Sequence, residues 1–212
     1  ADADDLAGMP VVVADLHSAL PAVLAGIRST HPHARVAYVM TDGGALPAAF
    51  SRAVAGLADA GWLASTITVG QAFGGDHEAV TTHTGLLAAR YVVGADVAVV
   101  TQGPGNVGTG TRWGYSGVGC ADALHAAEVL GGHGIASLRV SGADLRERHH
   151  GISHHSRTAY GRALLTGADV PVTTLPDAEL DALVREQLRT LVDTARARLT
   201  VVEVPADGLL EA

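Results

Sequence analysis

The chain of 212 residues contains no lysine, because all fourteen of its basic residues are arginine. A pyridoxal phosphate (PLP) enzyme needs a lysine amine for its Schiff base, and the phosphate-binding motif G-x-x-x-x-G-K-[ST] also needs a lysine. The sequence therefore excludes both a PLP cofactor and this motif. The bias toward arginine by itself is typical of a genome that favours arginine codons.

Cysteine and long hydrophobic runs are also scarce. Cys120 is the only cysteine, so the chain forms no internal disulfide and cannot build a cysteine-rich zinc site. The apolar fraction is 48%, but charged residues break the apolar stretches, and none predicts a membrane-spanning helix. The acidic first residues do not resemble a secretory leader. We therefore expect a cytoplasmic protein without a membrane partner, trimmed of an upstream region.

Basic residues are too few overall for general nucleic-acid binding. The formal net charge is −8, whereas nucleic-acid binding usually needs a basic surface. Residues 112–162 differ from this average, since they hold six arginines against four acidic residues. We expect no nucleic-acid partner, and we expect this segment to contact a small anionic ligand.

Short β-branched runs alternate with longer segments rich in alanine and leucine, which is typical of βαβ units over a buried parallel sheet. Predicted strands occupy residues 11–14, 36–40, 66–69, 96–101, 135–140, 170–174 and 199–204. Predicted helices occupy residues 46–60, 77–93, 120–130 and 177–198. The predicted fold class is α/β: a three-layer, doubly wound, mostly parallel sheet of about six or seven strands. Residues 1–10 are expected to be a disordered or linker lead-in, and residues 11–212 a single Rossmann-like α/β domain.

Polar and glycine-rich segments follow five of the predicted strands. They occupy residues 15–18, 41–44, 70–77, 102–111 and 141–155. The carboxyl ends of parallel strands lie at one edge of a sheet, where ligands bind in open α/β folds. The five segments are therefore expected to line one rim.

Residues 103–111 hold four glycines, two threonines and an asparagine, a composition that allows close backbone approach to an oxyanion. The segment matches G-x-G-x-x-G in letters, but Pro104 and the lack of a following helix disfavour an NAD site. A tight surface loop without a ligand is the alternative. The predicted anion-binding residues are Gly103, Gly105, Gly108, Thr109, Gly110, Thr111, Arg112 and Arg148.

Four of the eleven histidines fall within residues 149–155. Imidazole is the commonest metal ligand and also transfers protons near neutral pH. His149, His154 and His155 are the predicted ligands of zinc, manganese or iron, with a helix expected to begin at Ser153. Two alternatives remain open, namely histidines that act as proton donors or anion contacts without metal, and exposed histidines at a helix end.

Five further residues are candidate catalytic groups. Asp15 and His17 follow the first strand, where a carboxylate can orient an imidazole. Asp42 and Asp76 follow other strands and could complete a metal shell, although a turn and a helix cap explain them equally well. Ser153 stands among the histidines, but the absence of G-x-S-x-G disfavours a serine hydrolase.

Several motifs together are similar to those of a known family. They are DLHS at residues 15–18, YVMTDGGALP at 38–47, FGGD at 73–76, GPG at 103–105, GTGT at 108–111 and RHHGISHH at 148–155. In this combination the chain resembles the bacterial family of domain of unknown function 3866, from residue 11 to about residue 165. Members of that family look longer, with an additional amino-terminal region. The resemblance implies no reaction, so function has to come from the site residues.

Three hypotheses about function follow. The first is an enzyme of the hydrolase or lyase class that acts on a small anionic or phosphorylated metabolite, with or without the assistance of a metal ion. The second is a non-catalytic regulatory module that binds a nucleotide or metabolite. The third is a structural homo-oligomer with histidines at its interface, and a homo-oligomer is expected in any case.

Overall fold

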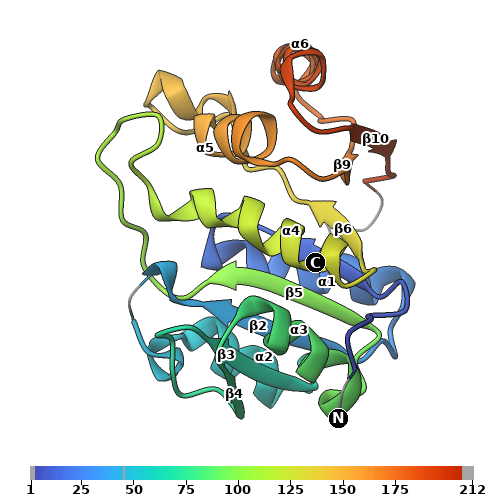
Figure 1. Ribbon diagram of the computed structural model, residues 1–212. Helices are drawn as coiled ribbons and strands as arrows, with labels where there is room; N and C mark the ends of the chain where they lie inside the picture. The colour runs from blue at the N-terminus through green and yellow to red at the C-terminus, as the bar shows by residue number, and fades with distance from the viewer. Residues whose placement is uncertain (1–2, 45, 207–212) are drawn as a thin grey trace.

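The computed structural model describes residues 3–44 and 46–206, and they build an α/β fold of three layers (Figure 1). The central sheet has eight strands in the order β10-β9-β6-β1-β5-β2-β3-β4. The strands are β1 (Pro10–Val13), β2 (Val36–Thr41), β3 (Ser65–Val69), β4 (His77–Ala79), β5 (Val97–Gln102), β6 (His133–Ala136), β9 (Ala168–Val172) and β10 (Leu199–Glu203). Neighbouring strands pair in parallel, which confirms the predicted fold class with slightly more strands than expected.

Six α-helices cover the two faces of this sheet. They are α1 (Leu20–Thr30), α2 (Arg52–Asp59), α3 (Thr82–Ala88), α4 (Cys120–Val129), α5 (His154–Thr158) and α6 (Ala178–Thr194). The helices α1 and α2 pack on one face, and the segments of α3, α4 and α6 pack on the other. No helix within the described ranges is long and apolar enough to cross a membrane.

The sequence of β2 shows why the sheet needs helices on both faces. Val36, Tyr38 and Met40 belong to the core beside α1 and α2, whereas Ala37 and Val39 belong to the core on the other side. Successive side chains of a strand point to opposite faces, so a run of apolar residues must be covered twice. The same alternation holds in β5, where Val99 faces one core and Val100 the other.

Three predicted elements are corrected by the structure. Residues 77–93 were expected to form one helix, but the first three form β4 beside β3, and a helix begins only after the Thr81 cap. The predicted helix at 46–60 is divided at Ser51, whose hydroxyl caps α2. The predicted strand at 135–140 ends at Ala136. A separate antiparallel hairpin of β7 (Val140–Ser141) and β8 (Gly151–Ile152) follows, and α5 begins directly after it.

The segment before β1 packs against the domain. Leu6 is fully buried, and its amide donates to the carbonyl of Leu130. Met9 is also buried, and its carbonyl accepts from the amide of His133. Residues 3–9, expected as a free lead-in, therefore contribute to the core at the amino edge of the sheet.

Candidate functional site

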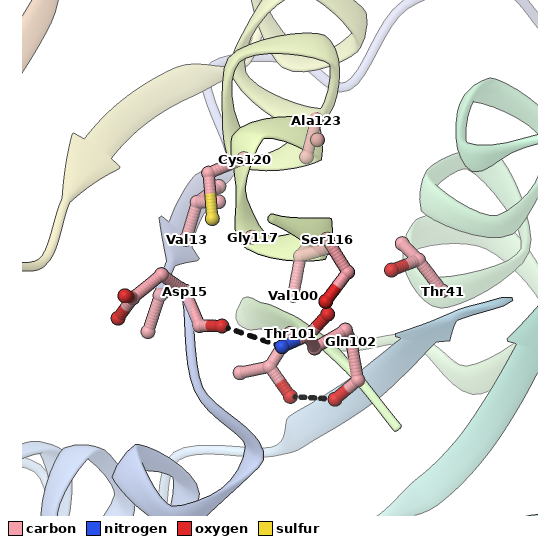
Figure 2. Close-up of a pocket in the computed structure, with 12 residues that line it drawn as sticks. Val13, Asp15, Thr41, Val100, Thr101, Gln102, Ser116, Gly117, Cys120 and Ala123 are labelled. Carbon is pink, nitrogen blue, oxygen red and sulfur yellow. Dashed lines mark hydrogen bonds between the residues drawn. The ribbon is translucent and has the colours of Figure 1, made fainter. Parts of the chain in front are cut away.

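The carboxyl ends of β1 and β5 meet at the centre of the sheet. The helices that follow these neighbouring strands pack on opposite faces, an arrangement at which ligands bind in open α/β sheets. A small cavity lies there, lined among others by Asp15, Gln102 and Cys120 (Figure 2). Its volume of about 20 Å³ holds roughly one water molecule. Burial raises the pKa of the Cys120 thiol, so this group stays protonated.

Asp15 connects the cavity to the histidine cluster. Figure 2 shows the Gln102 side chain donating to the carbonyl of Asp15, at 3.0 Å, while the Asp15 carboxylate points away from Gln102. On that other side, Asp15 Oδ2 lies 3.4 Å from Nδ1 of His155. Both atoms are buried, and neither has a hydrogen-bond partner among the described residues. The carboxylate is thus positioned to orient this imidazole.

His149, His154 and His155 form a compact cluster, as the sequence predicted. One ring nitrogen from each residue lies within 4.8 Å of those of the other two, so the cluster could hold a metal ion. The ring centres are 4.4 to 5.0 Å apart. His149 is the last residue of a short 3₁₀ turn, Glu147–His149, that precedes β8. His154 and His155 occupy the first turn of α5, whose cap is Ser153. The tight turn at Gly151, with φ +70°, brings the two parts together.

The surroundings of the cluster keep the imidazoles of His149 and His154 neutral. Burial, together with the charge of Arg139, lowers the pKa of His149 to about 4. Burial and the neighbouring His155 lower the pKa of His154 to about 4 as well. At neutral pH both rings therefore carry a lone pair instead of a second proton, which is the form that binds a metal.

Hydrogen bonds indicate which ring nitrogens are engaged within the protein and which are left for a ligand. Nδ1 of His149 is 2.8 Å from the hydroxyl of Ser153, which leaves Nε2 for a ligand. Nε2 of His154 is buried without a partner among the described residues. Ser153 itself is fully buried and also accepts from the amide of His155, so a substrate cannot reach it as a nucleophile. Its position instead holds His149 and the start of α5.

Tyr115 brings the loop after β5 onto this cluster. Its ring stacks on the imidazole of His155, with centres 4.0 Å apart and an interplanar angle of 4°. Its hydroxyl donates to the carbonyl of the same residue at 2.8 Å. The glycine-rich loop and the histidine segment, distant in sequence, therefore meet at one place, as the rim prediction requires.

Two arginines lie beside the cluster. Arg157 follows His154 by one turn of α5, and its Nε is buried without a partner among the described residues. Arg148 is exposed, and its Nη1 lies 4.0 Å from the position that a Cβ on Gly110 would occupy. The charges of both guanidinium groups contribute to the lowered pKa of His154, so both lie near this ring.

The glycine-rich loop itself is less open than the sequence suggested. The amide of Thr109 donates to the carbonyl of Gly114 at 2.7 Å, and the amide of Val107 donates to the Ser116 hydroxyl at 3.2 Å. Thr109 and Thr111 pair through their hydroxyls, and Arg112 is exposed. The amide of Thr109 and the hydroxyls of Thr109 and Thr111, which were predicted anion contacts, are thus used within the loop.

The near end of this loop faces β2 instead of the histidines. Cβ atoms on Gly103 and Gly105 would approach Met40 and the carbonyl of Gly44 to about 3.0 Å. The loop therefore extends from the segment after β2, at Gly103, to the histidine cluster, at Gly110.

His17 lies apart from the cluster. Its Nδ1 is 2.9 Å from the hydroxyl of Tyr38, and its Nε2 is 2.6 Å from the hydroxyl of Ser51, the cap of α2. Burial lowers the pKa of His17. Because both ring nitrogens are engaged, His17 ties the loop after β1 to α2, and the Asp15 carboxylate expected to orient it faces His155 instead.

Asp76 lies at the opposite edge of the sheet. Its carboxylate accepts from the Thr66 amide at 2.8 Å and from the Thr66 and Ser65 hydroxyls, all at the amino end of β3. The bond from the Thr66 amide is the main reason that the pKa of Asp76 is lowered. The prediction that Asp76 lies on the rim is wrong, because the chain crosses back to the amino end of β3 before β4 begins in parallel register.

Asp42 is on the rim but in a separate cavity. Its Oδ2 accepts from the amide of Gln71 at 2.8 Å. The cavity has a volume of about 310 Å³ and is lined by Asp42, Leu46, Gln71, Ala72 and Phe73. It is thus much larger than the cavity beside Asp15.

Three residues of the site were not among the predicted site residues. Arg157 had a readable signal, since it follows His154 by three positions in a predicted helix and shares its face. Gln102 directly follows a predicted strand, which also marks the rim. Tyr115 gave no local signal, because its contact with His155 spans forty residues.

The lowered histidine pKa values predict acid-sensitive stability of the metal-free protein. Between pH 4 and 6.5 the unfolded chain binds more protons at His149 and His154 than the folded chain, so stability falls as the pH falls through this range. We expect a loss of about 1–2 kcal/mol per histidine between pH 7.5 and 5, after solvent screening. Denaturant unfolding at each pH, in the presence of a metal chelator, measures this loss in the free energy of unfolding. A His154→Gln variant should lose less over the same interval, and equal losses would contradict the assignment.

Comparison with known proteins identifies the family. No curated protein and no solved structure matches the chain significantly. The sequence model of the family described as "Protein of unknown function (DUF3866)" matches residues 1–212, which is the whole chain. This agrees with the resemblance carried by the motifs around Asp15, Asp42 and the histidine cluster. The chain therefore belongs to the DUF3866 family.

Proposed function

We propose that the protein is a metal-assisted hydrolase of a small phosphorylated metabolite, with its metal held by His149, His154 and His155. One observation carries the proposal: three imidazoles converge, those of His149 and His155 buried and that of His154 half-buried, and the buried Nε2 of His154 has no hydrogen-bond partner among the described residues. A buried polar atom without a hydrogen bond lowers the stability of the fold, unless a bound ligand supplies the missing partner.

The donor set fits a divalent transition metal. Three imidazole nitrogens suit zinc, manganese or iron, and a three-histidine zinc site leaves the fourth position open for water or substrate. Metal–nitrogen bonds of about 2.1 Å place such nitrogens roughly 3.4 Å apart. The three ring nitrogens now lie within 4.8 Å of one another, so a small inward movement of the rings would bring them to this spacing. When bound, the metal would polarise the substrate and lower the pKa of a bound water.

The other residues of the site have supporting roles in this proposal. The Asp15 carboxylate, 3.4 Å from His155 Nδ1, favours the tautomer with its proton on Nδ1 and so leaves the other nitrogen of that ring for the metal. Tyr115 holds the same ring by stacking. Arg148 and Arg157 bind the anionic group, and two guanidinium groups beside a divalent cation favour a dianion such as phosphate over a single carboxylate.

Metal content and turnover test the proposal, with Asp15→Asn as the diagnostic variant. The chelator-treated protein should regain one zinc, manganese or iron ion per chain, and at least one of these forms should hydrolyse p-nitrophenyl phosphate. Asp15→Asn removes the charge that orients His155, so metal affinity should fall by about 10–100-fold. Elemental analysis and titration against a chelating indicator measure both effects.

A matched control is Asp122→Asn, an exposed carboxylate on α4. It should leave metal affinity within twofold of the wild type. Absence of bound metal in all three reconstitutions would overturn the proposal, as would an Asp15→Asn variant that binds metal like the control.

A further inference from the structure

We infer that the cavity beside Asp42 binds the ribose and base of a nucleoside phosphate, whose phosphate extends along the loop after β5 to the histidine cluster. This inference rests on the proposed function and names its substrate class. The cavity beside Asp42 has a volume of about 310 Å³, which lies within the range of small-ligand sites.

The Asp42 carboxylate suits a ribose diol. Its Oδ2 accepts from the Gln71 amide, whereas Oδ1 has no hydrogen-bond partner among the described residues. The close approach of Gly70, where a Cβ would lie 2.5 Å from Oδ2, fixes this side chain at the end of β2. A fixed carboxylate with one oxygen open accepts hydrogen bonds from vicinal hydroxyls, as acidic residues do at the ribose of bound nucleotides.

The apolar lining of the same cavity suits a nucleobase. Phe73 is 56% exposed and Leu46 is 43% exposed, so both present apolar surface to the solvent at this cavity. Stacking of a base on an aromatic ring is favourable and does not depend on base identity. A sugar phosphate without a base would leave this surface uncovered.

The spacing of Asp42 and Asp15 along the rim is comparable to the reach of a nucleotide. Thr41 of β2 pairs with Gln102 of β5, and Val13 of β1 pairs with Val100, so Asp42 and Asp15 lie at similar heights on the rim. They are separated by two strand spacings, roughly 10 Å. This is comparable to the length of a ribose with one or two phosphates. The loop from Gly103 to Gly110 runs along that path and ends at Arg148.

Binding of nucleotides to the metal-free protein tests the inference independently of the metal. Isothermal titration in a chelator would compare AMP, ADP, GMP and UMP with adenosine, ribose 5-phosphate and inorganic phosphate. At least one nucleotide should bind tenfold more tightly than ribose 5-phosphate. Asp42→Asn and Phe73→Ala should each weaken that binding by tenfold or more.

Two matched controls are available close by. Asp59→Asn changes another exposed aspartate, and Phe50→Ala changes another exposed phenylalanine, 65% exposed and outside the cavity lining. Both should stay within twofold of the wild type. The inference is overturned if no nucleotide binds better than ribose 5-phosphate, or if Asp42→Asn and Phe73→Ala behave like their controls.

The outcomes separate the two proposals. Nucleotide binding that depends on Asp42, in a protein that takes up no metal, would refute the metal-assisted reaction and support this site. Metal-dependent hydrolysis of p-nitrophenyl phosphate that is unaffected by Asp42→Asn, without preference for nucleotides, would support the reaction and refute this site.

Discussion

Replacement of His154 by alanine should lower metal affinity by about 100-fold or more and abolish hydrolysis. The change removes one of three imidazole ligands, and even the loss of an outer-shell partner typically costs 10–100-fold. His154 is the most informative of the three, because its buried Nε2 has no other hydrogen bond among the described residues to lose. Competition with a chelating indicator measures the affinity, and circular dichroism checks the fold.

The control for this variant is His83→Ala. His83 is an exposed histidine on α3, so its loss removes an imidazole from a helix without touching the cluster. It should bind metal like the wild type. If both alanine variants bind metal equally well, the three histidines are not the ligands. Stability in the absence of metal should not fall with His154→Ala, since a buried polar atom without a partner is removed.

Replacement of Gly44 by alanine should destabilise the fold by about 3 kcal/mol or more. A Cβ at this position would lie 2.5 Å from the carbonyl oxygen of Gly103 and 2.6 Å from that of Pro104. Both obstacles are backbone atoms, so no side-chain rotation relieves the clash. The loops after β2 and β5 would have to separate. Urea unfolding measures the free energy, and the same variant should lose nucleotide binding, since this contact joins the cavity to the loop.

Gly56→Ala on α2 is the matched control, with an expected effect of opposite sign. No atom lies within 4 Å of the position its Cβ would take. Alanine in a helix interior is favoured over glycine by up to about 1 kcal/mol, so this variant should be slightly more stable. If Gly44→Ala left the free energy of unfolding unchanged or raised it, the close packing of the two loops would be refuted.

The sequence was a good guide to those parts of the fold that depend on local patterns. The β-branched runs of β1, β2, β3 and β5 were placed within one or two residues, because strands buried on both faces have few polar interruptions. The strand β4 was missed. It is a short, largely exposed edge strand, and its residues His77–Ala79 continue into a helical pattern without a break. Strand order was also unreadable, since pairing partners are decided by long-range packing.

For the candidate site, the sequence identified the histidines but not their environment. His149, His154 and His155 stand together in sequence, and a turn at Gly151 is enough to bring their rings together. The partners of these rings come from distant strands, as with Asp15 and Tyr115. Asp76 and His17 follow strands just as Asp15 does, and only the path of the chain after each strand separates them from the cluster.

The buried segment around Leu6 has a practical consequence for how the molecule can be attached to a support. Because Leu6 and Met9 are anchored at the amino edge of the sheet, an affinity tag joined upstream emerges on the side remote from the rim. Immobilisation through such a tether leaves the rim, with the Asp42 cavity, on the side of the molecule away from the support. Surface-based binding measurements should therefore use the amino-terminal tether, since β10 ends at the same edge as the rim.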